Sequence, residues 1–195
     1  MNSLDNTRIE LTSELFSPAA MAHFEDELDM PVLKAGPDLY TFDGPVSWQI
    51  DVTNTGDAFL VTGTAEAKAK TACARCLEDA EFSLMGEIEG YFLIGGEDAA
   101  APEDMDEDEF DVLPDDHVID VYPLIVAALL LEIPLIPLCD DDCKGLCSTC
   151  GANLNEGPCG CAPGDDADFE MAKNPFAALA GFEFSDEDGK DASDR

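Results

Sequence analysis

Eight cysteines constrain the fold of this 195-residue chain more than any other feature, and six of them lie between positions 139 and 161. The full set is Cys73, Cys76, Cys139, Cys143, Cys147, Cys150, Cys159 and Cys161. Clustered thiols form disulfides, redox centres or metal sites, and each of these implies a different kind of protein. The choice depends on the compartment, which the rest of the sequence indicates.

The sequence predicts a cytoplasmic protein without a membrane contact. Residues 1–20 contain three carboxylates and lack the apolar run of a secretory signal. The longest apolar stretch, Val121–Leu131, is too short to cross a bilayer. In a reducing compartment, clustered cysteines are more often metal ligands or catalytic thiols than disulfides. Disulfides are therefore disfavoured.

The cysteine spacing favours structural zinc, one or two ions per chain. Four thiolates close a tetrahedral zinc site, and eight make two such sets. Cys147 and Cys150 have C-x-x-C spacing with Gly151 directly after, the pattern of a zinc knuckle, and Cys159 and Cys161 complete this set. The second set takes its ligands from the motifs CARC and CDDDC, and consists of Cys73, Cys76, Cys139 and Cys143.

Three other interpretations of the cysteines stay open. The CARC pair has the spacing of a dithiol redox switch, but a thioredoxin-type centre places that pair at a helix N-terminus, which lowers the thiol pKa. Here the motif joins two predicted strands. An iron–sulfur cluster at one set and a group of reduced, inert thiols are the remaining alternatives.

Alternating apolar and polar residues predict that the first half of the chain is β-rich. Such a period of two is typical of strands with one buried face. The predicted strands lie near 8–11, 39–42, 46–52, 59–70 and 80–94. Gly86 and Gly90 interrupt the apolar face of the last strand and suggest a bulge or strong coiling there. The predicted class is α+β, an antiparallel β-sandwich or open barrel with one buried helix.

The predicted helix spans residues 120–133, and three further segments complete the organisation of the chain. Asp120 is the expected N-cap, Pro123 lies in the first turn and Pro134 ends the helix.

Residues 97–116 carry many carboxylates and no basic residue, so we expect a disordered acidic loop. The predicted domains are a β-rich domain over 1–138, a zinc-binding cysteine module over 139–162, and a C-terminal region over 163–195. That last region holds an acidic connector, a short helix at NPFAALAGF and a disordered tail.

The charge balance indicates what kind of partner the protein can take. The chain has 44 acidic and 9 basic residues, and its formal net charge is −35. Such a surface repels phosphate backbones, whose binding depends on Lys and Arg, and attracts basic proteins. A general acidic adaptation for solubility is the alternative explanation. We find no catalytic motif and no phosphate-binding loop, so we expect neither an enzyme nor a small-molecule substrate.

Several motifs together resemble the YceD family, the large ribosomal RNA subunit accumulation proteins. They are CARCLEDAEF, ID at 119–120, LLLEIPLIPLC, DCKGLCSTCGANLNEGPCGC and NPFAALAGF, in that order. The resemblance covers about residues 40–182 and implies a bacterial cytoplasmic factor that supports accumulation of 23S ribosomal RNA. Some members lack the equivalents of the four C-terminal cysteines, from Cys147 to Cys161, but keep a CARC-type pair. This implies that the C-terminal site is a separable stabilising module.

The resemblance and the charge together predict a non-enzymatic factor in ribosome biogenesis. We expect its partner to be a basic ribosomal protein or a pre-ribosomal particle, bound through the acidic surface. The rival hypothesis is direct binding of ribosomal RNA by the zinc module. Lys144 is the only basic residue between Arg75 and Lys173, which is too little charge for a phosphate groove.

Overall fold

The computed structural model describes residues 6–95, 105 and 110–161. The chain divides into two compact units, Met1–Gly145 and Leu146–Arg195, which are treated separately below. Most of the predicted acidic loop, at 97–104 and 106–109, lies outside the described residues. The predicted C-terminal connector, NPF helix and tail lie outside them as well.

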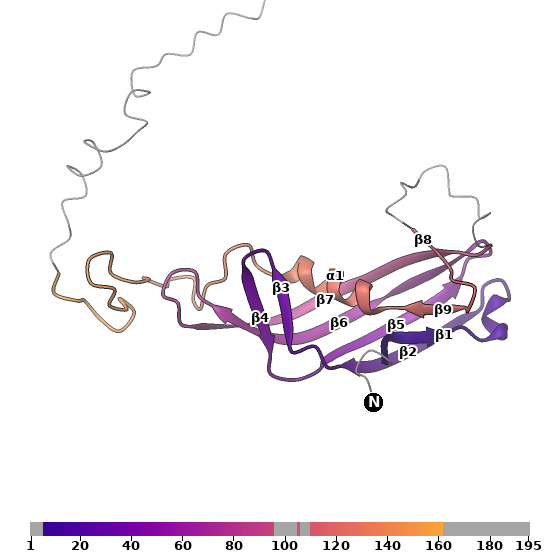
Figure 1. The fold of residues 1–195 in the computed structure, drawn as a ribbon, viewed down its shortest axis with the longest axis horizontal. Helices are drawn as coiled ribbons and strands as arrows, with labels where there is room; N and C mark the ends of the chain where they lie inside the picture. Colours follow the sequence, from indigo (N-terminus) through magenta and orange to yellow (C-terminus); the bar gives the residue numbers. More distant parts are fainter. Residues whose placement is uncertain (1–5, 96–104, 106–109, 162–195) are drawn as a thin grey trace, which may run out of the picture. The chain divides into compact units, whose positions relative to one another are not determined.

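The first unit is built on an antiparallel sheet whose longest strands are consecutive in the chain (Figure 1). The strands are β1 (Arg8–Glu10), β2 (Met21–Leu28), β3 (Val32–Ala35), β4 (Asp38–Phe42), β5 (Val46–Asn54), β6 (Ala58–Ala72), β7 (Asp79–Leu93), β8 (Asp111–Val112) and β9 (Val118–Asp120). A 3₁₀ turn, η2 (Ser13–Phe16), follows β1. Strands β2 to β8 form a seven-stranded sheet, and β1 pairs with β9 separately.

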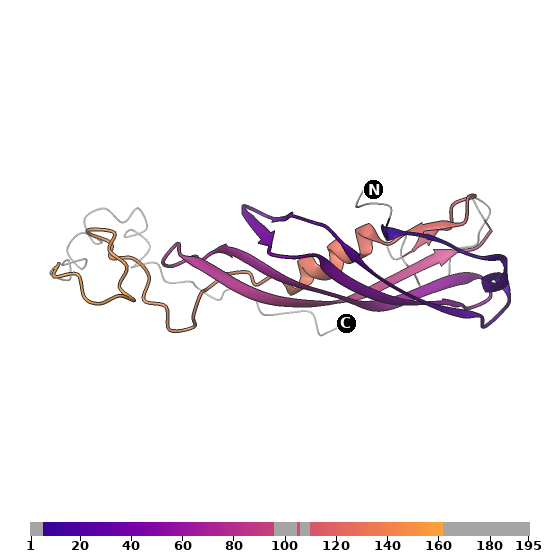
Figure 2. The same ribbon diagram turned by 90° about the horizontal axis from the view of Figure 1, so that it is seen from below.

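The predicted α+β class is confirmed, but the sandwich or open barrel is not what the described residues form. The seven strands make one sheet that does not close, with β2 and β3 at the ends of the path β2-β5-β6-β4-β3. β7 pairs with β6 along its whole length, and β8 adds to β7 in parallel. One face of the sheet is covered by the helix α1 (Tyr122–Glu132), which packs against β7 and β6 (Figure 2). Because a helix covers this face, the sheet does not need a second sheet to bury it.

The acidic segment is more ordered at its C-terminal end than we expected. Residues 97–116 carry like charges that predict an extended loop, yet Asp111 and Val112 form β8 beside Phe92 and Leu93 of β7. Leu113 is buried directly afterwards. An apolar side chain that reaches the core therefore outweighs the local charge density at this point.

The helix is buried on one side only, which corrects the predicted buried helix over 120–133. Ile125, Ala128 and Leu129 are buried against the sheet. Leu131 is 83% exposed and Leu135, just after the helix, is fully exposed. The segment is apolar all round, so its sequence gives no sign of which side faces the core. Only packing against β7 selects that side.

Asp120 supports the start of α1 although it is not the N-cap. The N-cap residue is Val121, and Pro123 lies in the first turn as predicted. The Asp120 carboxylate accepts a hydrogen bond from the Tyr122 N–H at 3.0 Å and one from the Thr7 hydroxyl at 3.1 Å. The same side chain therefore ties the helix start to the N-terminal segment.

We expect the substitution Asp120→Ala to lower the free energy of unfolding by about 1 kcal/mol, because a free helix N–H loses its acceptor. The substitution Asp120→Asn keeps an acceptor oxygen and should cost less. Urea unfolding followed by circular dichroism measures both. Equal losses for the two variants would contradict the proposed role of the acceptor oxygen.

Candidate metal centres

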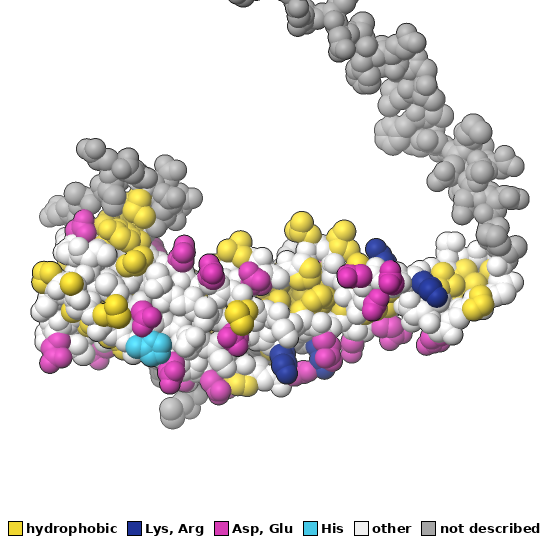
Figure 3. Space-filling model, turned by 180° about the vertical axis from the view of Figure 1, so that it is seen from behind, with side chains coloured by type: hydrophobic (Ala, Val, Ile, Leu, Met, Phe, Trp, Pro, Cys, Tyr) yellow, Lys and Arg dark blue, Asp and Glu magenta, His cyan; other side chains and the backbone are white. Residues whose placement is uncertain are grey.

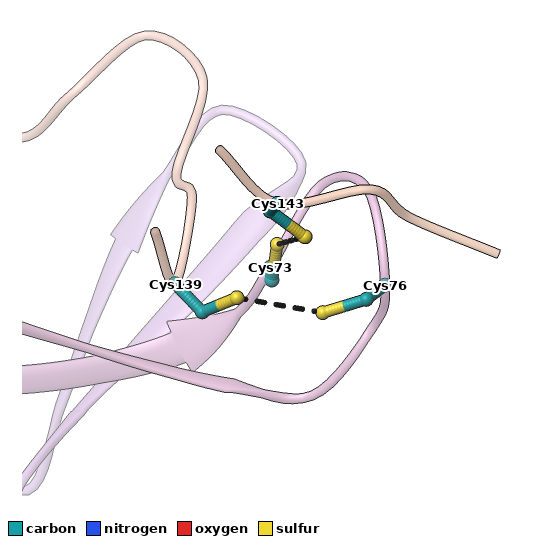
Figure 4. Close-up of side chains that lie close together, drawn as sticks. All are labelled: Cys73, Cys76, Cys139 and Cys143. Atoms are coloured by element: carbon teal, nitrogen blue, oxygen red, sulfur yellow. Dashed lines mark hydrogen bonds between the residues drawn. The ribbon is translucent and has the colours of Figure 1, made fainter. Parts of the chain in front are cut away.

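The first cysteine cluster joins the turn between β6 and β7 to the segment after α1. Cys73 directly follows β6, and Cys76 lies in the turn before β7. Cys139 and Cys143 come from the chain that follows the helix. The four side chains point toward one another in Figure 4. Segments far apart in the sequence thus supply two ligands each.

Backbone hydrogen bonds hold the β6–β7 turn in place. The Cys73 N–H donates to the Glu78 carbonyl at 2.8 Å, and the Leu77 N–H donates to the Cys73 carbonyl at 2.9 Å. The Ala74 N–H donates to the Pro137 carbonyl at 2.8 Å, which joins the turn to the segment before Cys139. The turn is therefore positioned by main-chain contacts as well as by its thiols.

The side chain of Arg75 connects the two halves of the first cluster. Its guanidinium donates to the carbonyls of Asp141 at 3.1 Å and Cys143 at 2.9 Å. Its positive charge lies within the CARC motif and satisfies two carbonyls of the CDDDC segment.

The sulfur geometry of the first cluster fits a tetrahedral metal site. The Cys73 and Cys143 sulfurs are 3.8 Å apart and the Cys76 and Cys139 sulfurs are 3.6 Å apart. All four ligand atoms lie within 4.8 Å of one another. A zinc–sulfur bond of about 2.3 Å in a tetrahedron gives a sulfur–sulfur distance of about 3.8 Å. A metal ion of zinc's size therefore fits between these thiols.

The thiols of the first cluster differ strongly in their affinity for a proton. Burial raises the pKa of Cys73, but the backbone N–H groups of Cys76, Cys139 and Arg75 outweigh it and lower that pKa to about 6. The side-chain hydrogen bond with Cys76 and burial raise the pKa of Cys139 to about 12. Four like charges cannot form together near neutral pH without a cation, since each thiolate opposes the next. Such a set of donors is suited to a divalent metal.

The second unit carries the other four cysteines on a short knuckle. The Gly151 N–H donates to the Cys147 carbonyl at 2.8 Å, and the Cys147 N–H donates to the Ala152 carbonyl at 2.8 Å. Gly151 has a φ of +72°, a left-handed conformation that favours glycine. This turn brings Cys147 and Cys150 together. It is the local geometry that the C-x-x-C-G spacing predicts.

The second cluster repeats the electrostatics of the first. The sulfurs of Cys147, Cys150, Cys159 and Cys161 also lie within 4.8 Å of one another. The N–H groups of Cys150 and Thr149 lower the pKa of Cys147 to about 6. Side-chain hydrogen bonds with Cys150 and Cys159 raise the pKa of Cys161 to about 12. These thiols are more exposed than those of the first cluster, of which Cys73, Cys76 and Cys143 are buried.

The structure brings the eight cysteines together in the two groups of four that their spacing predicted, and none of them forms a disulfide. That they ligate a metal stays a prediction. The CARC pair lies among two further thiols, so it is not the isolated pair that a dithiol switch requires. Sequence reasoning missed the contributions of Glu78 and Pro137, whose carbonyls hold the first site. Carbonyl groups leave no residue-type signal from which they could have been found.

Fold and site define a class of protein, namely one with a mostly antiparallel sheet covered by one helix and with two tetracysteine clusters that could bind metal. Residues 61–183 match the sequence profile of the family described as large ribosomal RNA subunit accumulation protein YceD. The chain belongs to the YceD family, which is implicated in the accumulation of large-subunit ribosomal RNA.

Several relatives of this chain are known. An uncharacterized protein of Mycobacterium tuberculosis is 33% identical over 143 residues, which are 72% of this chain and 67% of the relative. The chloroplastic YCED homolog 1 of Arabidopsis thaliana, named a large ribosomal RNA subunit accumulation protein, is 31% identical over 140 residues. These are 60% of this chain and 44% of that protein. No solved structure matches the chain.

Within residues 6–95, 105 and 110–161, no helix has the length and apolarity that crossing a bilayer requires.

Proposed function

We propose that this protein is a non-enzymatic factor that supports 23S ribosomal RNA accumulation and large-subunit biogenesis in the cytoplasm by binding a basic ribosomal protein. Membership of the YceD family carries the first part of the proposal. The net charge of −35 supports the second part, because an acidic surface attracts and steers basic partners. Stabilisation of RNA does not require that this chain touch it.

In this proposal the two cysteine clusters are structural zinc sites. The sulfur distances of 3.6 and 3.8 Å in the first cluster support zinc. When bound, the metal neutralises the thiolates that otherwise repel one another. The protein itself holds the four sulfurs in place through the β6–β7 turn, the Arg75 guanidinium and the CDDDC segment. The sites maintain the shape of the acidic surface and take no part in a reaction.

Deletion of the gene in the organism that carries this chain is expected to lower the ratio of 23S to 16S ribosomal RNA, because large subunits fail to accumulate. Quantitative RNA sequencing or gel analysis of total RNA measures this ratio. Expression of the wild-type chain should restore it. An unchanged ratio in the deletion strain under all growth conditions would refute the proposed function.

The rival hypothesis of direct RNA binding is tested by recovering the tagged protein from cells with and without nuclease. We expect basic ribosomal proteins to remain bound after nuclease treatment. Recovery of ribosomal RNA after those proteins have been stripped away would favour the rival hypothesis.

A further inference from the structure

The face of the sheet opposite α1 is not covered by any element of the described residues. Side chains alternate between the two faces, so the residues between the buried ones of β2, β5, β6 and β7 share this outer face. Its exposed carboxylates include Glu25, Glu27, Asp51, Glu66, Glu87 and Glu89, and Lys68 is an exposed base on the same face. The space-filling view in Figure 3 shows acidic side chains along such a face, with a histidine among them.

The strand register makes these carboxylates one continuous surface. Glu25 lies opposite Gln49, which lies opposite Thr64, which in turn lies opposite Glu87. The next row runs from Glu27 through Ser47 and Glu66 to Met85. Neighbouring strands are about 4.8 Å apart, so each row spans roughly 14 Å. That width accommodates an extended peptide segment with its side chains.

This outer face is also hollowed along β5 and β6. A central hollow of about 430 Å³ is lined by Glu25, Asp26, Glu27, Ser47, Trp48, Gln49, Thr64 and Glu66. It shares Gln49 and Thr64 with a hollow of about 220 Å³ on one side. It shares Ser47 and Glu66 with a hollow of about 550 Å³ on the other side. The three hollows adjoin through these shared residues, and we call the surface that they line the outer groove.

Carboxylates outnumber basic side chains in the outer groove, where Lys68 lines the largest hollow and His23 lies beside Glu25 and Asp51. Within the described residues, Glu27, Glu66 and Glu87 make no ion pair with a lysine or arginine. Lys70 lies further along β6 and is paired with Asp43 and Glu81. Carboxylates concentrated in a hollow strengthen the local negative potential, which a basic ligand would relieve.

Exposed methionines lie at both ends of this face. Met21 is 66% exposed and Met85 is 59% exposed, and Met85 lines the outer groove. Methionine side chains adapt to irregular partners, and the aliphatic stems of lysine and arginine pack on apolar surface. A groove with carboxylates in its centre and Met85 in its lining matches basic polypeptide better than it matches an inorganic cation.

We propose that the outer groove is the docking surface for the basic partner, and that it takes an extended, lysine- or arginine-rich protein segment lying along β5 and β6. This inference rests on the proposed function, and it locates the contact on the folded sheet and not on the acidic loop over 97–116. Basic side chains meet Glu25, Glu27 and Glu66, while Gln49 and Thr64 offer hydrogen bonds to the segment. Nucleic acid is excluded from the groove by its phosphate charge.

The direct test measures binding of a fluorescent lysine-rich peptide to the full-length protein by anisotropy. In the groove variant, Glu25→Gln, Glu27→Gln and Glu66→Gln remove three charges. The control variant removes three exposed charges elsewhere, by Glu14→Gln, Asp115→Asn and Glu132→Gln. Exposed ion pairs are individually weak, so we expect the groove variant to raise the dissociation constant by about tenfold in sum. The control variant should change it by less than about twofold, since distant charges are screened by salt.

The outcomes separate this inference from the proposed function. If both variants weakened binding equally, the peptide would be attracted by net charge alone, and the outer groove would not be the docking surface. Tight binding of a single-stranded polyuridine RNA by the wild-type chain would also refute the outer groove as a docking surface for a basic protein. In the deletion strain, full restoration of 23S RNA by the groove variant would refute the groove and leave the proposed function intact. Circular dichroism shows whether both variants fold.

Discussion

The purified protein is expected to contain two zinc ions per chain, and their removal is expected to unfold the first unit. Structural zinc contributes roughly 10–16 kcal/mol of apparent binding free energy in small metal-folded peptides at neutral pH. A whole domain is stable by only about 5–15 kcal/mol. Because the first cluster ties β6 and β7 to the segment after α1, loss of its metal frees that segment from the sheet. Elemental analysis measures the metal content, and circular dichroism with a chelator follows the unfolding.

Two cysteine variants distinguish the clusters from each other. Cys73→Ser is expected to lose one zinc ion and to lower the melting temperature of the sheet, because Cys73 is buried in the first unit. Cys159→Ser is expected to lose one zinc ion while the sheet melts as in the wild type, because Cys159 belongs to the second unit. If either variant retained both zinc ions, the substituted cysteine would not be a metal ligand. Iron in place of zinc would favour the iron–sulfur alternative.

The second large effect is expected from Gly86→Val in β7. A Cβ atom built on Gly86 collides with the backbone carbonyl of Ala128 in α1. Backbone cannot move aside as a flexible side chain does, so the helix has to lift from the sheet. We expect a loss of about 2–3 kcal/mol in the free energy of unfolding, the upper range for overpacking a core. Urea unfolding measures this loss.

Gly44→Val is the matched control for this prediction. An added Cβ at Gly44 meets no atom within 4 Å, so the same substitution should alter the free energy of unfolding little. If Gly86→Val were as stable as Gly44→Val, then α1 would not depend on the close approach to β7. The same result would weaken the packing scheme of the first unit.

The position of Gly86 also shows a limit of sequence reasoning. Gly86 and Gly90 interrupt an apolar face and therefore suggested a bulge, but β6 and β7 pair residue for residue over this region. The missing side chains make room for the helix: a Cβ on Gly90 would press against Leu124. A glycine in a strand is compatible with both explanations. Only the neighbouring element distinguishes them.

Strand β2 was missed for a related reason. Its apolar positions Ala22, Phe24 and Leu28 follow a period of two, but Asp26 occupies an inner position of the same pattern. The structure accommodates Asp26 at the sheet edge, where it accepts hydrogen bonds from Asn6 and from the Glu27 N–H. An inward charge is tolerated on an edge strand, where it also discourages pairing with other chains. Whether a strand lies at an edge is decided by tertiary structure.

By itself the sequence determined the local features of this protein. Alternation located β5, β6 and β7, and cysteine spacing located the knuckle at Cys147 and Cys150, because strand period and C-x-x-C-G geometry depend on near neighbours. Tertiary structure alone decided that α1 covers one face of an open sheet and that, within the described residues, no element covers the other. The grouping of Cys139 and Cys143 with Cys73 and Cys76 was predicted from the motifs, but the contacts that produce it appear only in the tertiary structure. Contacts between distant segments depend on which surfaces bury each other, and a periodic pattern states that a face is apolar but not what packs on it.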